Sequence, residues 1–382
     1  MRRHLALAVV ESARVYTVIA LSVAFLVSLV VTLLVVRYEH LHAHVTADHD
    51  LDGVQKFHTT AVPRVGGIGV VTGLLCGVLA KLFLEPEVAG FGLLVMVAAI
   101  PAFVAGLIED LTKRVSVSKR LLATALSAAV GGLLLGGWLT RLDVPGIDYL
   151  MAFGVVSVLV TCFAVAGVAN AFNLIDGYNG LAGMVAVIIF MGLAYVADQV
   201  SDRAIMITAF AAAGAILGFL VWNYPRGLIF LGDGGAYLIG FLVAELSVLL
   251  VARNPQVSPW FPLLLAFYPI FETVFTIFRR VVIGKTHPGL PDAAHLHQLI
   301  YRRVVRWAVG TDCVKKKTQR NALTSPYLLV MASLAVIPAT VFWNNTIALQ
   351  LVALIFASFY IWVYREIYKV RFPKWLAIKK KK

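Results

Sequence analysis

The stretch Asn170–Gly183, NAFNLIDGYNGLAG, lies between two long apolar runs, and polar side chains recur in it at every third position. They are Asn170, Asn173, Asp176 and Asn179. A helix has about 3.6 residues per turn, so a step of three predicts that these side chains point roughly one way. Gly177 and Gly180 break or thin that helix. A polar helix cap between two spans is the alternative, but four polar groups in register favour a functional site at a membrane boundary.

The rest of the chain is mostly apolar. Its 382 residues are 60% hydrophobic and only 14% charged, whereas a soluble protein carries about a quarter charged residues. This composition predicts an all-α, polytopic integral membrane protein whose residues 1–382 form a single domain. The net charge of +13 is concentrated in loops and in a basic tail at 365–382. Membrane orientation and anionic lipid account for such charges, so no nucleic-acid partner is expected.

Eleven segments are apolar and long enough to be membrane spans. They are residues 15–37, 65–84, 91–108, 120–138, 148–169, 181–197, 204–222, 235–252, 260–281, 326–343 and 346–364. The first follows Arg2 and Arg3 as a signal peptide would, but its length favours a retained span. An odd number of spans puts the two termini on opposite sides of the membrane.

Lysine and arginine are distributed unevenly between the two sets of loops. One set, with the tail, holds about 22 of these residues and the other, with the N-terminus, about 6. The positive-inside rule therefore predicts a cytoplasmic C-terminus and an N-terminus outside. The predicted cytoplasmic loops are residues 38–64, 109–119, 170–180, 223–234 and 282–325, and all the unusual polar motifs fall in or beside them.

Two of these motifs carry carboxylates. Glu109 and Asp110 directly follow an apolar span and precede Lys113 and Lys119. Acidic next to basic side chains suit a metal-bound phosphate, although a charged loop that anchors the span is the alternative. Asp233 stands between glycines and is a candidate metal ligand, although such a sequence by itself is more often a turn.

The remaining motifs are basic. Lys56, His58 and Arg64 could bind phosphate or could be ordinary positive-inside residues. The glycines that follow Arg64 favour close helix packing over a dinucleotide fingerprint, because no strand precedes them. His295 and His297 could bind zinc, but no third ligand has a suitable spacing. With Arg302 close by, contact with a phosphate or a nucleotide is favoured.

Together and in this order, the motifs from Pro63 to Gln298 resemble the polyprenyl-phosphate N-acetylhexosamine-1-phosphate transferases, of the glycosyltransferase family 4 type. The Asp-Asp pair of that family is Glu109-Asp110 here. Its Asn-Ala-x-Asn-Leu-x-Asp-Gly-x-Asp-Gly motif is similar to Asn170–Gly180, with Asn179 in place of the last Asp. Its Phe-x-Gly-Asp resembles Phe230–Asp233, and its His-x-His-His resembles His295–Gln298, which ends in Gln.

The resemblance implies transfer of N-acetylhexosamine-1-phosphate from a UDP-sugar to undecaprenyl phosphate, with release of UMP. The loop after Pro63 favours GlcNAc-1-phosphate, and another UDP-N-acetylhexosamine is the alternative. The reaction would be the first membrane step of O-antigen or other cell-envelope polysaccharide synthesis, at the inner membrane with the active site facing the cytoplasm. Mg²⁺ is the implied cofactor, with Mn²⁺ as a substitute. The implied partners are both substrates and membrane lipids, with a homodimer as a candidate assembly.

The resemblance also implies roles for individual residues. Asp233 and Asn173 would hold Mg²⁺. Glu109 and Asp110 would support the metal or deprotonate the lipid phosphate, and Asp176 would orient the phosphates or the metal shell. Asn179 would contact uracil. The full expected set of substrate contacts is Lys56, His58, Arg64, Lys113, Lys119, Asn170, Asn179, His295, His297 and Arg302.

Two other classes of function remain as alternatives. A transporter or lipid flippase would more often place its polar residues near mid-membrane in paired broken helices, and no inverted repeat is visible in the sequence. A membrane scaffold would use the loops only to dock partners. Turnover of a nucleotide sugar separates both from an enzyme.

Overall fold

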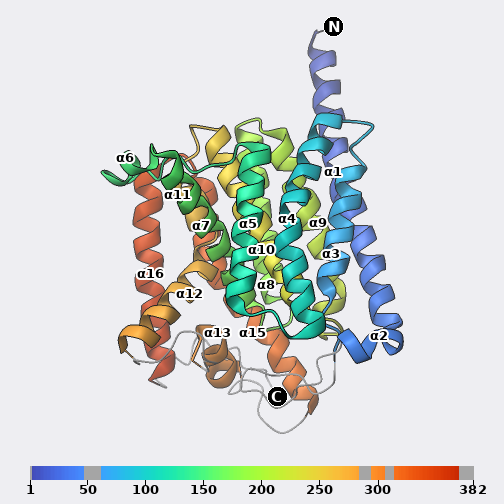
Figure 1. Ribbon diagram of the computed structural model, residues 1–382, viewed down its shortest axis with the longest axis vertical. Helices are drawn as coiled ribbons and strands as arrows, with labels where there is room; N and C mark the ends of the chain where they lie inside the picture. The colour runs from blue at the N-terminus through green and yellow to red at the C-terminus, as the bar shows by residue number, and fades with distance from the viewer. Residues whose placement is uncertain (1, 47–61, 284–293, 306–313, 370–382) are drawn as a thin grey trace.

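The computed structural model describes residues 2–46, 62–283, 294–305 and 314–369, and within these ranges every regular element is a helix (Figure 1). Nine of the described helices are long and apolar enough to cross a membrane. They are α1 (Arg2–Arg37, apolar over Val18–Arg37), α4 (Pro86–Thr112), α5 (Val117–Leu135), α7 (Gly154–Ile175), α8 (Leu181–Gln199), α9 (Arg203–Asn223), α10 (Gly232–Arg253), α15 (Val314–Val341) and α16 (Thr346–Tyr368). The predicted class, an all-α polytopic membrane protein, is confirmed.

Two of the eleven predicted spans take a different form. The segment 65–84 holds α3 (Gly66–Leu79), a helix of 14 residues followed by a turn. The segment 260–281 is divided into α11 (Trp260–Leu265), α12 (Phe267–Phe278) and the beginning of a π-helical turn, η1 (Arg279–Ile283). Pro269 has no N–H to donate to the carbonyl of Leu265, so a continuous helix would lack a hydrogen bond at the point where α11 ends. Figure 1 shows α12 slanting away from the long helices.

Helix α10 is the centre of the bundle. It packs against α3, α4, α5, α7, α8 and α9. Of the residues in its most apolar 18-residue stretch, 94% are buried. Apolar and small residues occur all round this helix rather than on one stripe, so it can be covered on every side. Outer helices instead expose large apolar side chains such as Leu122, Phe163 and Leu354, as expected where a surface meets lipid. Asp233, at the start of α10, therefore lies in the middle of one end of the bundle.

The loop before α3 pairs with the loop before α10 through backbone hydrogen bonds. Gly66 N–H donates to Phe230 O and Gly67 N–H to Leu231 O, both at 2.9 Å. A Cβ on Gly67 would lie 2.5 Å from the backbone nitrogen of Gly235, so no larger residue fits. The interpretation of these glycines as close-packing residues is confirmed, and their pairing brings the neighbouring Arg64 to the start of α10.

The short helices lie at the two ends of the bundle. Figure 1 shows α2 (Glu39–Thr46) and α13 (Leu296–Leu299) at the lower end, and α6 (Ile147–Met151) at the upper end. Helix α1 begins at the upper end and α16 finishes at the lower end, in agreement with an odd number of crossings. The π-helical turn η2 (Ile300–Val305) follows α13. The side of the membrane on which each end lies remains a prediction from the charge distribution.

Candidate active site

Asp110 joins the last turn of α4 to the first turn of α10. Its Oδ1 accepts the N–H of Asp233 and its Oδ2 accepts the N–H of Gly234, both at 2.8 Å. The side chain is only 1% exposed. The first N–H groups of a helix have no partner within the helix, and a carboxylate that accepts them is also favoured by the positive end of the helix dipole. Asp110 therefore anchors the start of α10 and fixes the backbone that carries Asp233.

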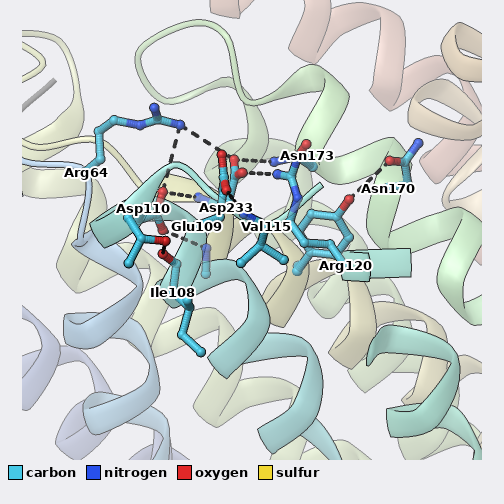
Figure 2. A network of polar contacts seen from close by, with 12 residues as sticks. Arg64, Ile108, Glu109, Asp110, Val115, Arg120, Asn170, Asn173 and Asp233 are labelled. Atoms are coloured by element: carbon cyan, nitrogen blue, oxygen red, sulfur yellow. Dashed lines mark hydrogen bonds and ion pairs between the residues drawn. The ribbon is translucent and has the colours of Figure 1, made fainter. Parts of the chain in front are cut away.

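The carboxylate of Asp233 collects side chains from two other helices. Asn173, on α7, donates its Nδ2–H to Oδ1 at 2.8 Å. Arg120, on the first turn of α5, forms an ion pair with Oδ2. Figure 2 shows Asn173 and Arg120 converging on Asp233. Side chains from α5 and α7 thus meet the Asp233 carboxylate of α10, although Asn173 and Arg120 are 60 and 113 residues from Asp233 along the chain.

Arg64 adds a second positive charge to this cluster. Its Nη2 lies 3.8 Å from Asp110 Oδ1 and 3.6 Å from Asp233 Oδ1, and its side chain is 26% exposed. In Figure 2 it reaches over the two carboxylates from the side opposite Asn173. Arg64, from the predicted first cytoplasmic loop, therefore lies beside the acidic residues. Lys56 and His58, predicted with it, lie outside the described residues.

Arg120 is a site residue that we did not predict from the sequence, where Lys113 and Lys119 were the expected phosphate contacts. Lys113 and Lys119 are both exposed, whereas Arg120 is 8% exposed and reaches Asp233. A sequence signal for this difference exists. The small or polar residues Thr124, Ser127 and Ala128 follow Arg120 at helical spacing and form the buried face of α5, while Lys119 is on the outer face with Leu122 and Leu126.

Asn170 belongs to the same network through an aromatic side chain. Tyr237 donates its hydroxyl to Asn170 Oδ1 at 3.2 Å. The guanidinium of Arg120 lies 5.4 Å from the centre of the Tyr237 ring, within the range of a cation–π contact. Asn170 is therefore linked to Arg120 through Tyr237, and Figure 2 shows Asn170 well away from Asp233.

Glu109 has a different position from its neighbour Asp110. Its Oε2 accepts the N–H of Val115 at 2.6 Å and so closes the turn after α4. Lys113, within that turn, adopts a left-handed conformation with φ of 54°. Successive helical residues are about 100° apart around the axis, so only one of two adjacent carboxylates can face α10. Asp110 takes that position.

The predicted polar ridge of Asn170, Asn173, Asp176 and Asn179 is interrupted. Helix α7 ends at Ile175, so Asn170 and Asn173 share a helical face but Asn179 does not, and the prediction of one common direction is wrong for Asn179. Burial raises the pKa of the Asp176 carboxyl well above its ordinary value, against the Arg64 charge and together with the Asp110 charge. Asp176 therefore lies within electrostatic range of the carboxylate cluster.

Asn179 is 5% exposed, and its polar groups bond to other loops and to α15. Its side-chain Nδ2–H donates to Pro225 O at 3.1 Å. Its backbone N–H donates to Asn321 Oδ1 at 2.7 Å, and its carbonyl accepts the Ser325 hydroxyl at 2.6 Å. These contacts hold the turn after α7 in place. Contact of Asn179 with uracil stays a prediction, and its donor would have to leave Pro225 to make it.

His295 and His297 lie together beside the turn after α7. Their rings stack with centroids 5.0 Å apart and planes at 6°, and both residues are buried. The ring of His297 meets Tyr178, from the Asn170–Gly183 stretch, edge to face at 5.6 Å. Arg302, in η2, is half-buried and close enough to Tyr178 to act on it electrostatically. The predicted histidine motif is thus brought to the second half of the central stretch.

The donors at Asp233 fit a magnesium ion. Mg²⁺ prefers oxygen ligands and is commonly held by one or two carboxylates, with water and substrate phosphates in its other positions. Asp233 offers a carboxylate, and the amide of Asn173 lies beside it. In the part of the chain that the structure describes, no three His, Cys, Asp or Glu side chains form a ready metal cage. Asp233 and Asn173 are the residues that would hold such an ion.

Comparison with known proteins gives the family context. Residues 92–251, from α4 to α10, match the family described as glycosyl transferase family 4. The chain is 29% identical over 281 residues to a probable undecaprenyl-phosphate N-acetylglucosaminyl 1-phosphate transferase of Bacillus subtilis (strain 168), covering 73% of this chain and 76% of the relative. It is 29% identical over 263 residues to the undecaprenyl-phosphate alpha-N-acetylglucosaminyl 1-phosphate transferase of Escherichia coli (strain K12), covering 66% and 69%.

A third relative is named for a different transferred group. The phospho-N-acetylmuramoyl-pentapeptide-transferase of Geobacillus kaustophilus (strain HTA426) is 28% identical over 245 residues, covering 61% of this chain and 74% of the relative. The region matched by the family contains Asp110, Asn173 and Asp233. The resemblance predicted from the motifs is therefore confirmed: this chain is similar to undecaprenyl-phosphate N-acetylglucosaminyl 1-phosphate transferases, and its residues 92–251 match glycosyl transferase family 4.

Proposed function

We propose that this chain transfers N-acetylhexosamine-1-phosphate, with GlcNAc-1-phosphate as the expected group, from a UDP-sugar to undecaprenyl phosphate and releases UMP. The observation that carries the proposal is the convergence of Asn173, Arg120 and Arg64 on Asp233, whose backbone is held by Asp110. The names of the relatives, which are undecaprenyl-phosphate GlcNAc-1-phosphate transferases, support this choice of substrates.

The two arginines supply the charge that the reaction needs. A lipid phosphate and a nucleotide diphosphate are both anionic, so bringing them together requires positive groups at the transferring phosphoryl. Arg64 and Arg120 lie on opposite sides of Asp233, and α10 begins at this point with the positive end of its dipole. Both arginines neutralise the carboxylate until substrate phosphates compete for them.

Asp233 and Asn173 would hold the metal, and Asp110 would keep Asp233 in place. When bound, Mg²⁺ supplies charge neutralisation at the phosphate oxygens in a phosphoryl transfer. Asp110 uses both oxygens to accept backbone N–H groups, and Glu109 uses Oε2 in the same way. These contacts support a positioning role for the acidic pair. The lipid phosphate is then the attacking group, and Asp176 orients the phosphates.

An apolar cavity in the bundle suits the hydrocarbon part of the acceptor. It has a volume of about 250 Å³ and lies between α7, α10, α11 and the loop before α6. Its lining includes Val165 on α7, Val248 on α10 and Trp260 on α11. An isoprenoid chain has no hydrogen-bonding groups, and burying it in such a cavity is favourable in proportion to the apolar area covered. We assign this cavity to a part of the polyprenyl tail.

Turnover by purified protein tests the proposal. Detergent-solubilised protein is incubated with undecaprenyl phosphate and Mg²⁺ against a panel of UDP-N-acetylhexosamines, and UMP and the lipid-linked sugar diphosphate are measured. One UDP-sugar should give both products in equal amounts. Chelation should abolish turnover, Mg²⁺ should restore it, and Mn²⁺ should substitute. Uptake of substrate into vesicles without any UMP release would favour the transporter alternative.

The cellular role follows from the same chemistry. We place the reaction as the first membrane step of a cell-envelope polysaccharide such as O-antigen, at the inner membrane with the carboxylate cluster facing the cytoplasm. The concentration of Lys and Arg in the loops on that side supports the orientation. Reporter fusions after Gly177, Asp233 and His297 should all report cytoplasm, and a fusion after Ala89 should report the outside. A fusion after His297 that reports the outside contradicts the orientation.

A further inference from the structure

Glu272 is a fully buried acid on α12 that belongs to none of the motifs of the proposed reaction. Its Oε1 accepts the backbone N–H of Leu296 at 2.8 Å, and its Oε2 accepts the hydroxyl of Tyr360, on α16, at 2.7 Å. Leu296 is the residue between the two histidines of the His-x-His motif. The carboxylate therefore ties α12 and α16 to the backbone of that motif.

Both histidine rings turn the same nitrogen toward this carboxylate. The Nδ1 atoms of His295 and His297 lie 3.6 Å and 3.8 Å from Glu272 Oε1. Thr276, one turn further along α12, has its Oγ1 3.1 Å from His295 Nδ1. The near-parallel stacking of the rings at 5.0 Å follows from this shared orientation.

A carboxylate beside Nδ1 also favours one position for the ring proton. An imidazole that faces a carboxylate with Nδ1 carries its hydrogen there, which leaves the lone pair on Nε2, at the far side of the ring. The negative charge of Glu272, 3.6 Å and 3.8 Å from the two Nδ1 atoms, therefore favours this tautomer in both rings. The edge-to-face contact of His297 with Tyr178 extends this arrangement to the central stretch, two residues from Asp176.

We propose that Glu272 is a positioning residue: it orients His295 and His297 for binding of the nucleotide sugar and does not touch the substrate. The identity of the ligand, a nucleotide sugar, rests on the proposed function, whereas the orientation of the two histidines by Glu272 does not. Six side chains surround Glu272 and the two histidines. They are Thr276 on α12, Tyr268 at the start of α12, Tyr178 after α7, Tyr301 and Arg302 in η2, and Tyr360 on α16. None of them carries a negative charge at neutral pH.

The other buried glutamate shows what is specific to Glu272. Glu245, on α10, is also inaccessible to solvent, yet neither of its carboxyl oxygens has a hydrogen-bond partner in the described residues. It lies against Gly131 on α5 and far from the histidines in sequence. A change from Glu to Gln at either position is the same chemical change in a buried helix, so Glu245→Gln is a matched control.

A double-mutant cycle tests the coupling. We expect Glu272→Gln and His297→Gln each to raise the KM for the UDP-sugar about tenfold, on the scale of one lost hydrogen bond, with kcat within about threefold. Because Glu272 acts through His297, the double variant should raise the KM for the UDP-sugar by no more than about twentyfold. The KM for undecaprenyl phosphate should not change, and Glu245→Gln should remain within about twofold in both constants. Independent effects, which would multiply to about a hundredfold, overturn the proposal.

Hydrogen exchange separates this inference from the proposed function. In Glu272→Leu the acceptor for Leu296 N–H is lost, and we expect amide exchange in the segment 294–300 to become at least about tenfold faster, while Glu245→Leu leaves it unchanged. If the wild-type chain turns over no UDP-sugar, the proposed function fails while this measurement still decides whether Glu272 positions the motif. Unchanged protection of the segment in Glu272→Leu overturns the positioning role by itself.

Discussion

Asp110 holds Asp233 by its backbone: the carboxylate at the end of α4 accepts, at 2.8 Å, the N–H of the residue on which Asn173, Arg120 and Arg64 converge. The side chain of Asp233 is thereby left for Asn173 and Arg120. A position fixed through the main chain does not depend on side-chain rotamers, so the carboxylate is presented with little freedom.

Replacement of Asp233 by Asn should lower kcat by two or more orders of magnitude, which is the scale of losing one preorganised electrostatic group. The fold should be kept, because Asp110 binds the backbone at this position and not the side chain. UMP release gives the rate, and thermal unfolding in detergent gives the stability. Asp198→Asn, the same change at an exposed position near the end of α8, is the control. Near-normal turnover in Asp233→Asn would remove Asp233 from the site.

The two adjacent acids should respond differently to loss of charge. In Asp110→Asn one of the two backbone N–H groups faces an amide NH₂ instead of an oxygen, so the free energy of unfolding should fall by about 1–3 kcal/mol. Glu109→Gln keeps an oxygen for Val115 N–H and should cost less than about 1 kcal/mol. Chemical or thermal unfolding of both variants decides the comparison, and equal losses would contradict the assigned contacts.

Arg120 and Lys119 form a second adjacent pair for comparison. Arg120→Ala removes the ion pair with Asp233 and should reduce kcat/KM by at least about tenfold, because Asp233 keeps Asn173 and Arg64 but loses the positive charge closest to it. Lys119→Ala changes an exposed side chain and should have the smaller effect. Steady-state kinetics of both variants are the measurement. A larger loss in Lys119→Ala would instead support the phosphate contact predicted for Lys119 from the sequence.

A pH dependence of stability is expected at the opposite end of the bundle. The Arg203 guanidinium, which hydrogen-bonds Glu85, holds the pKa of that carboxyl below its ordinary value of 4.5, with Lys81 adding to the effect and burial opposing it. A lowered pKa means that the pair stabilises the fold fully above about pH 4.5 and that this stabilisation is lost as the pH falls through the lowered value. The contribution should be about 1 kcal/mol at most, as for other partly exposed ion pairs.

The measurement for this pair is the unfolding temperature in detergent between pH 6 and pH 3.5. Glu85→Gln should be less stable than the wild type at pH 6, and the difference should shrink on acidification. Glu87→Gln changes an exposed glutamate on the same turn and serves as the control. If the difference in unfolding temperature between Glu85→Gln and the wild type grows at low pH, the ion pair does not have the predicted stabilising effect.

Direct attack by the lipid phosphate can be separated from a covalent enzyme intermediate by isotope exchange. The oxygens of Asp110 and Oε2 of Glu109 accept backbone N–H groups, which leaves these acids poorly placed as nucleophiles. Labelled UMP should therefore enter the UDP-sugar only when undecaprenyl phosphate is present. Robust exchange in lipid-free protein would require a phosphorylated carboxylate and would contradict direct attack.

The sequence by itself determined the class of the protein and most of its spans, because lipid leaves few solutions for a backbone: apolar runs must be helices with their hydrogen bonds satisfied internally. The same constraint made polar residues such as Asn173 and Asp233 conspicuous beside apolar runs. Motif order was enough to predict the family. None of these inferences needed any contact between distant residues.

Only the tertiary structure decided which member of each neighbouring pair reaches the site. Asp110 rather than Glu109, and Arg120 rather than Lys119, face α10, because the rotation of α4 and α5 about their axes is set by packing against that helix. The break between α11 and α12 likewise let Glu272 meet Leu296 and Tyr360. Helical periodicity relates residues within one helix, whereas the phase between two helices is determined by how their side chains interlock.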